Sequence, residues 1–482
     1  MQHFLCALGA TPVLALATPA IAQTIDKSAT YPAAAAGDGA TTGGYNLSRW
    51  AEDWRALCDP ARRDDPIDAL KCVKLTPSGD VYVTLSGEAR LRVNHTTNPN
   101  LRDSRAQRQD ILRLVGGADL HMGEHLRVYG ELAHGSITGI ELGAPAATLR
   151  NRVAVQQLFA EATGEVAGIE VGARYGRQEF VDGPNLLVSQ RDNNTIRYTL
   201  NGTRLWARGK AMRVDLFDLK PTQYGDLGSD DDVIDPARRF SGVTLGFVVP
   251  KALAGKAKLY FDPFFWRRRN TVGAWGGRIG PATRYYLGAH LFGEAGPVTI
   301  DWSVNHQWGD FRDQRIDAWQ ALFAQNVRLG SGKRAPRIGF HADYASGGGG
   351  YGDGKLRNAY APFGNNIYYS YGLFLTPSNL IAVAPTLALS PSSRLRVSAE
   401  LQRAWRANVH DAVYRASGQP FAGTQNVRDA HIGDVARLQL VWAIAPRLSL
   451  TGRYEHFAAG RGLRNAGYAS SDFVAGWLSF RF

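Results

Sequence analysis

The chain ends in a regular alternation of apolar and mixed side chains that stops on an aromatic residue. Between Asp472 and the terminal Phe482, alternate positions form one set of Val474, Gly476, Leu478, Phe480 and Phe482 and another of Phe473, Ala475, Trp477, Ser479 and Arg481. Because successive side chains of a strand point to opposite faces, this pattern predicts a strand with one apolar face. Such a strand would be an aggregation hazard at the edge of a soluble sheet, whereas a closed barrel has no edge.

The same alternation recurs from Asp80 onward. The longest run, over 81–94, places valines and leucines opposite Glu88, Arg90 and Arg92. Its length exceeds that of most strands in globular proteins and fits a tilted strand that crosses a bilayer. Further alternating segments lie at 126–133, 169–176, 298–305, 394–402, 436–442 and 447–455. Their polar faces carry charges of both signs, which a water-filled lumen tolerates and a soluble core does not.

These patterns predict an all-β fold, a transmembrane antiparallel β-barrel over residues 80–482. Ala445-Pro446-Arg447 is short enough for a tight turn, whereas 222–239, 267–283, 345–367 and 408–434 read as long loops. A chain of this length would supply roughly 16–18 strands. A closed barrel satisfies every backbone hydrogen bond in lipid, and no apolar run long enough for a membrane-spanning helix follows the N-terminal region.

The N-terminal region predicts export and a small periplasmic element. Residues 1–22 read as a cleavable signal peptide that ends at Ala20-Ile21-Ala22, and 23–79 as a flexible leader followed by a short helical segment. Trp50, Trp54 and Leu57 share one helical face, and Asp65-Pro66 is typical of a second helix start. In an oxidising periplasm we expect Cys58 and Cys72 to form a disulfide that clips two short helices together; the alternative is two free buried thiols.

Two motifs resemble enzyme sites and are better explained as connections between strands. Residues 347–352 match a dinucleotide-binding glycine pattern, but no helix follows them, so we expect a flexible surface loop. His121 to His125 match a zinc-protease pattern, but Gly123 interrupts it and a strand begins at Leu126, which favours a turn. No nucleophile is grouped with a base, so the sequence predicts a protein that is not an enzyme and uses neither metal nor cofactor.

The positive charge of the chain comes mainly from arginine. The sequence holds 55 Lys and Arg residues, of which 10 are Lys, against 43 Asp and Glu, for a net charge of +12. The planar guanidinium suits carboxylates and phosphates, although a genomic bias toward arginine codons is an alternative explanation. A signal peptide and arginines spread over many strands argue against nucleic-acid binding.

Short motifs in several strands resemble the alginate-export family of outer-membrane proteins. These are 172–179, where Gly176-Arg177-Gln178 ends a strand, then 186–191 and an expected strand at 194–197, and later 339–347 and 379–381, the aromatic terminus and the segment Trp50 to Trp54. The resemblance implies an 18-stranded barrel in the outer membrane, acting as a monomer, with an electropositive lumen that conducts a polyuronate such as alginate. Export would require periplasmic secretion partners.

Face assignment gives a set of candidate lumenal residues. The arginines are Arg90, Arg92, Arg127, Arg174, Arg177, Arg197, Arg396, Arg437 and Arg453, and Glu131, Asp301 and Glu400 are expected to pair with some of them. Arginines along a low-dielectric constriction would attract a polymer with one carboxylate per sugar. The alternative for each arginine is an ion pair that only stabilises the lumen wall. Alternative functions are a nutrient porin for small anions or oligosaccharides and a non-conducting adhesin or scaffold.

Overall fold

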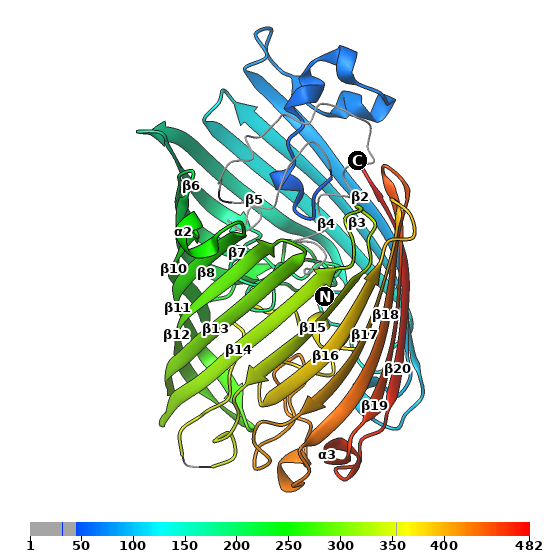
Figure 1. Cartoon of the computed structure of the whole chain (residues 1–482). Coiled ribbons are helices and arrows are strands. Elements are labelled where there is room, and N and C mark those ends of the chain that lie inside the picture. Colours follow the sequence, from blue (N-terminus) through cyan, green and yellow to red (C-terminus); the bar gives the residue numbers. More distant parts are fainter. Residues whose placement is uncertain (1–30, 32–44, 353) are drawn as a thin grey trace.

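A computed structural model describes residues 31, 45–352 and 354–482. The predicted signal peptide and almost all of the predicted leader lie outside these residues. Eighteen long strands form one closed antiparallel barrel (Figure 1). They are β2 (Val81–Thr96), β3 (Gln107–Met122), β4 (Leu126–Ile140), β5 (Asn151–Val166), β6 (Ile169–Gln178), β7 (Leu200–Arg208), β8 (Met212–Gln223), β10 (Arg238–Val248), β11 (Lys258–Trp275), β12 (Arg278–Ala295), β13 (Val298–Phe311), β14 (Gln314–Arg328), β15 (Arg337–Ala345), β16 (Leu380–Leu389), β17 (Leu395–Trp405), β18 (His431–Ala445), β19 (Leu448–Ala459) and β20 (Ser471–Arg481).

The terminal strand closes the barrel, which confirms the interpretation of its alternation. β20 pairs with β19 on one side and with β2, the first barrel strand, on the other, from Glu88 opposite Arg481 to Thr96 opposite Phe473. Beyond the strand, the Phe482 amide donates to the Gly87 carbonyl at 3.1 Å, and the Gly87 amide donates to the Phe482 carbonyl at 2.9 Å. The first and last strands are therefore joined over most of their length.

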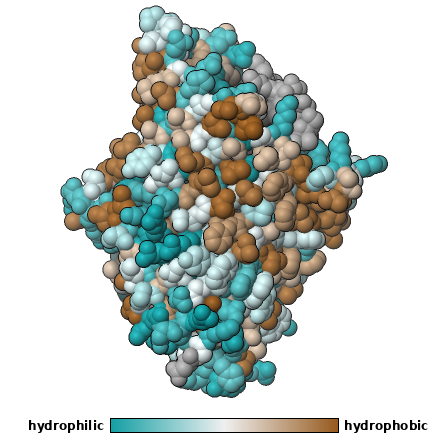
Figure 2. Space-filling model, turned by 90° about the vertical axis from the view of Figure 1, so that its left-hand side faces the viewer, coloured by the Kyte–Doolittle hydropathy of each residue, from teal (hydrophilic) through white to brown (hydrophobic). Residues whose placement is uncertain are grey.

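The two faces of the strands match the predicted sorting of side chains. Outward positions are apolar and exposed, with Leu91 61%, Leu401 64% and Tyr175 70% accessible, whereas Glu88 and Arg174 point inward and are buried. Figure 2 shows hydrophobic residues gathered across the middle of one face of the barrel and hydrophilic residues over its lower end. An apolar outer band around a charged interior is the arrangement that a lipid bilayer requires.

Short and long connections lie at opposite ends of the barrel. Short turns join β3 to β4, where Gly123 has a φ of +67°, and β18 to β19 at Pro446-Arg447, and both were predicted as turns. The other end carries long connections at 179–199, 346–379 and 406–430 (lower end in Figure 1). The loop predicted at 267–283 is wrong, because β11 and β12 continue to a turn at Gly276-Gly277. Arg267 to Arg269 hid the alternation of β11.

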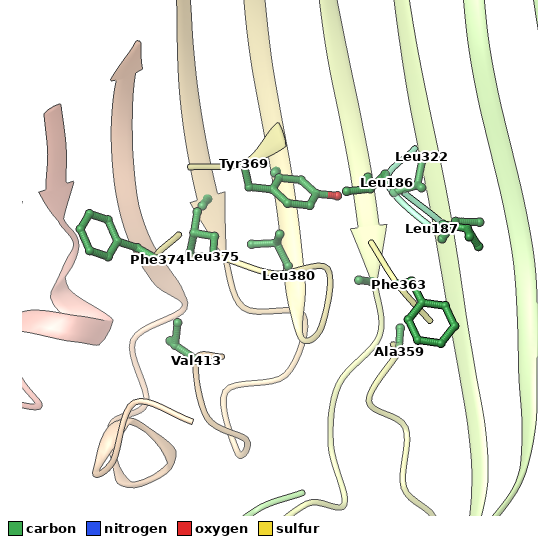
Figure 3. Packing of buried hydrophobic residues seen from close by; sticks show 14 of the residues in the cluster. Leu186, Leu187, Leu322, Ala359, Phe363, Tyr369, Phe374, Leu375, Leu380 and Val413 are labelled. Atoms are coloured by element: carbon green, nitrogen blue, oxygen red, sulfur yellow. The ribbon is translucent and has the colours of Figure 1, made fainter. Parts of the chain in front are cut away.

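The long connections fold into the barrel instead of extending away from it. Leu186 and Leu187 of one loop pack near Leu322 of β14, and Phe374 and Tyr369 of another lie near wall residues such as Leu380 of β16 (Figure 3). Two predictions fail here. Of residues 347–352, which were predicted as a flexible surface loop, 347, 348 and 350 are buried and only 351 and 352 are exposed. Residues 194–197 lie in the loop before β7 instead of forming a strand. In both places the loop backbone bonds to buried side chains and to other loops.

Before the barrel, the chain forms short turns of 3-10 helix in place of the two predicted helices. They are η1 (Arg49–Ala51), η2 (Arg55–Cys58), η3 (Pro60–Arg62) and η4 (Pro66–Leu70). The Asp65 side chain caps η4 by accepting from the Ile67 amide at 2.8 Å. Cys58 and Cys72 are joined by a disulfide, with their Cα atoms 5.0 Å apart. Trp50 is buried inside the barrel and Trp54 is not, so no single helical face forms.

The remaining elements are minor. They are β1 (Val73–Lys74) beside β2, β9 (Val233–Ile234) beside β8, α2 (Lys251–Ala254), α3 (Arg461–Arg464), η5 (Pro99–Leu101), η6 (Asn366–Tyr368) and η7 (Thr424–Asn426). Among the residues described, no helix is long and apolar enough to cross a membrane.

Candidate functional site: the charged lumen

A continuous ion-pair network crosses the middle of the lumen. Its cations are Arg49, Arg90, Arg113, Arg197 and Arg481, and its anions are Glu88, Glu131, Glu179 and Asp192. Asp192 lies on the loop 179–199 and contacts Arg197 at 2.7 Å, Arg113 at 2.9 Å and Arg90 at 3.1 Å. Burial would raise the pKa of the Asp192 carboxyl, but Arg90, Arg197 and Arg113 lower it well below its ordinary value. The Asp192 carboxylate is therefore ionised, and its ion pairs hold the loop in the lumen.

Glu88 is the residue that joins the most arginines in this network. Its carboxylate lies 3.0 Å from Arg90, 3.3 Å from Arg481 and 3.7 Å from Arg113, and it also pairs with Arg49. These partners come from β2, β20, β3 and the N-terminal segment. One carboxylate therefore links both ends of the chain across the closure of the barrel.

A second group, the arginine–aromatic stack, consists of Arg92, Arg437 and Arg453 with Tyr371 and Trp477. The guanidinium carbons of Arg92 and Arg453 lie 5.1 and 4.9 Å from the centre of the Trp477 ring. Arg453 also lies 4.7 Å, and Arg437 5.2 Å, from the Tyr371 ring. Stacking on an aromatic face fixes a guanidinium while leaving its N–H groups directed at the surroundings.

Two arginines of the stack, Arg437 and Arg92, differ in their polar partners. Arg437 pairs with Glu400, whereas Arg92 donates to the Asn94 side chain at 2.7 Å and to the Asn193 carbonyl at 2.9 Å. Among the residues described, no carboxylate lies within ion-pair distance of Arg92. Neutral groups therefore position the Arg92 guanidinium, and its positive charge can attract an anion in the lumen.

A third group, the outer basic cluster, lies nearer the long loops and consists of Arg191, Arg268 and Arg284 with Tyr198 and Tyr360. Arg268 and Arg284 are directly opposite each other on β11 and β12. Arg268 lies 4.7 Å from the Tyr360 ring and Arg191 5.2 Å from the Tyr198 ring, and Arg284 donates to the Asn358 carbonyl at 2.8 Å. Within the described part of the chain, none of the three arginines has a carboxylate within ion-pair distance.

The electrostatics of this cluster are visible at Tyr360, which lies on the loop 346–379. Burial alone would raise the pKa of its phenol, but Arg268, Arg191, Arg238 and Arg284 together lower the pKa below its ordinary value. Among the residues that the structure describes, Arg238 alone of these four has a carboxylate within ion-pair distance, that of Asp235. These four guanidinium groups around one phenol make this part of the lumen electropositive.

The other predicted lumenal residues are dispersed. Arg127 pairs with Asp119 at 2.6 Å, Arg174 with Glu161, and Arg177 donates to Asn201 at 3.1 Å. Arg396 is on β17, on the same face as Ser398 and Glu400.

The predicted carboxylates have partly different partners from those expected. Glu400 pairs with the predicted Arg437, but Glu131 pairs with Arg49, and Asp301 contacts His290 at 2.7 Å instead of an arginine. The sequence offered no way to identify Arg49, Arg191, Arg268 or Arg284, because they lie outside the clearest alternating runs.

The described residues contain no group of three or more His, Cys, Asp or Glu side chains that could hold a metal ion. The lumen instead combines guanidinium groups, aromatic rings and amides. Such a surface can bind and guide anions and planar or sugar-like faces.

Comparisons with known proteins agree with this geometry. A family model described as alginate export matches residues 81–476. No curated protein matches the sequence. Among solved structures, the chain resembles OccK2 (OpdF) of Pseudomonas aeruginosa in complex with glucuronate, with 12% identity and a TM-score of 0.53, covering 83% of this chain and 98% of that one. A BenF-like porin from Pseudomonas fluorescens Pf-5 gives 9% identity, a TM-score of 0.54, and coverage of 83% and 98%. OccAB1 of Acinetobacter baumannii gives 12%, 0.53, 83% and 96%. At these identities the likeness concerns the fold.

Proposed function

Because the chain belongs to the alginate export family and folds as an outer-membrane channel, we propose that it conducts an anionic polysaccharide, alginate or a related polyuronate, out of the cell. The observation that carries this proposal is the set of lumenal arginines with no carboxylate partner among the described residues, namely Arg92 in the stack and Arg191, Arg268 and Arg284 in the outer basic cluster. A polyuronate presents one carboxylate per sugar, so successive cations along a lumen can bind its carboxylates one after another.

The aromatic rings beside these arginines support a sugar polymer as the cargo. Tyr198 and Tyr360, which are only partly buried, offer flat faces next to guanidinium groups. A uronate residue has both an apolar ring face and a carboxylate. The position of Arg92 and the outer cluster at different depths would provide several weak sites in place of one tight site. Conduction requires this, since a tightly held ion or polymer does not leave.

The second candidate is uptake of small anions through the same lumen. It is favoured by the structural likeness to OccK2, which was solved in complex with glucuronate, a single uronate, and to a BenF-like porin. Both candidates use the same arginines, and they differ in the length of the cargo and in the direction of transport.

Single-channel recording in planar bilayers tests the proposal. The refolded mature protein is expected to give a current whose reversal potential under a salt gradient shows anion selectivity. Oligouronates of increasing length should block this current at micromolar to millimolar concentration, more strongly with length, while neutral oligosaccharides of the same length should not. Block by monomeric uronate with no gain from chain length would instead favour the small-anion porin.

A pair of matched variants assigns the effect to the outer basic cluster. Arg268→Gln combined with Arg284→Gln should weaken block by oligouronate and reduce anion selectivity. Arg461→Gln, whose side chain is 70% exposed on α3 and pairs with Asp429, removes a similar charge outside the lumen and should leave both unchanged. Equal block in the double variant and the wild type would contradict the role proposed for the cluster.

A further inference from the structure

Residues 45–51 enter the lumen from the mouth with the short turns. Ser48, Arg49, Trp50 and Ala51 are buried inside the barrel, and Trp50 is only 4% exposed. The segment precedes residues 81–476, the part of the chain that the family model matches.

Arg49 holds the segment to the barrel wall through two buried carboxylates. Its guanidinium pairs with Glu88 on β2 and lies 3.2 Å from Glu131 on β4. Arg49 is the only cation in ion-pair contact with Glu131 among the residues described. Withdrawal of the segment would leave that buried carboxylate without its cation, which strongly favours the docked state.

Trp50 fills the space beside Arg49. Its ring lies 3.8 Å from the guanidinium carbon of Arg174 and makes an edge contact with Phe159, with the ring centres 6.1 Å apart. Arg174 is itself paired with Glu161, so the tryptophan covers an arginine of the lumen wall that would otherwise face the pore. Trp50 thus covers a lumenal arginine, the kind of group that an anionic cargo would use, while Arg49 pairs with carboxylates of the wall.

The segment also meets the loop that enters from the opposite mouth. The Ser48 hydroxyl donates to Glu179 at 2.5 Å, and Arg197, after Asp192 on the same loop, donates to the Leu47 carbonyl. Segments from the two ends of the barrel are thus in direct contact near the middle of the lumen. Cys58–Cys72 anchors the chain just outside, so a displaced segment stays beside the mouth.

We propose that residues 45–51 form a plug that closes the pore, with Arg49 as the residue that holds it in place, and that cargo passes only when the plug withdraws toward the mouth with the short turns. The plug therefore determines the open fraction of the channel. This inference rests on the channel function, but not on the uronate as cargo.

Arg49→Gln tests the plug in planar bilayers. We expect the open fraction to rise by at least about tenfold, since loss of one partner of a buried ion pair shifts an equilibrium by that factor or more. Trp50→Ala should also raise the open fraction, because it removes the contacts of the plug with Arg174 and Phe159. Arg55→Gln lies just after the plug, with its side chain 72% exposed, and should match the wild type.

Folding of each variant is checked by the heat-dependent mobility of the barrel in gel electrophoresis. A thiol-reactive, membrane-impermeant reagent on Ser48→Cys gives a second readout, and labelling should be slow alone and fast when combined with Arg49→Gln. Folded variants with wild-type open fraction and labelling would overturn the plug while leaving anion conduction intact. Absence of any channel, in variants and wild type alike, would overturn both the plug and the proposed function.

Discussion

Trp477 is the side chain on which two lumenal arginines converge. It is buried on the inner face of β20, between Arg92 of β2 and Arg453 of β19. A guanidinium stacked on a ring keeps its orientation without a carboxylate, and therefore keeps its positive potential in the lumen. The tryptophan thus positions charge for an anion without neutralising it.

Trp477→Ala should weaken block by oligouronate about fivefold to thirtyfold, because each cation–π contact contributes about 1 kcal/mol to holding its arginine. The measurement is the oligouronate concentration that halves the single-channel current. Trp442→Ala is the matched control, since this tryptophan lies outward and is 43% exposed. An unchanged half-blocking concentration in Trp477→Ala would remove the stack from the conduction path.

Lys71 predicts how docking of the N-terminal region depends on pH. Burial lowers the pKa of its ammonium to about 8, although Glu52 opposes the shift, and its Nζ donates to the Leu85 carbonyl at 2.7 Å. Between about pH 8 and 10.5 the undocked chain binds a proton that the docked chain does not. Docking should therefore strengthen as pH rises through this window, by at most about 3 kcal/mol. Hydrogen exchange of residues 45–80 measures this, and Lys71→Met should abolish the trend.

At the scale of elements, the N-terminal region is held together by its disulfide. The bridge closes a loop with a sequence separation of 14 residues between Cys58 and Cys72, beside four short 3-10 turns that share little packing. Such turns are too short to be stable alone, so the covalent link carries much of the order of this region.

Replacing both cysteines by serine should destabilise the docked region by about 3 kcal/mol, the loop-closure value for a loop of this length. Limited proteolysis should then cleave within 52–80 at least about tenfold faster, while the barrel keeps its heat-dependent mobility. Cleavage at the wild-type rate would indicate that packing alone holds the region.

The outward faces of the strands predict how the barrel responds to a charge placed in the lipid-facing band. Leu438, in the middle of β18, faces outward and is 47% exposed. Leu438→Arg should lower the free energy of unfolding by about 2–4 kcal/mol, as expected for arginine near the bilayer midplane. Denaturant titration in lipid measures it, with Leu438→Phe as the apolar control that should stay close to the wild type.

Alternation predicted the barrel and both faces of eight of its strands, because pairing in lipid imposes a period of two. It missed β11, where Arg267 to Arg269 interrupt the pattern. It located Arg92, Arg437 and Arg453 on inner faces, but not their meeting on Tyr371 and Trp477, which depends on neighbours distant in sequence. It could not place loops 179–199 and 346–379 inside the barrel, since a loop that packs internally has no period. The position of Arg49 inside the lumen could not be predicted for the same reason.

At the scale of the whole molecule, closure makes the lumen a shared surface. The arginine–aromatic stack draws on β2, β18, β19, β20 and the loop 346–379, and the outer basic cluster on β11, β12 and two loops. No piece of the chain contains either site, which is why short motifs identify the fold more readily than the cargo.

Glu88 lies on the first strand of the barrel, and one of its cations, Arg481, is the penultimate residue of the chain. Almost the entire barrel is synthesised between them. In a nascent or truncated protein this carboxylate lacks the arginine that only the finished strand supplies, so the lumen acquires its complete balance of charge at the moment of closure. The ion-pair network around Glu88 is therefore complete only when the last strand has paired with the first.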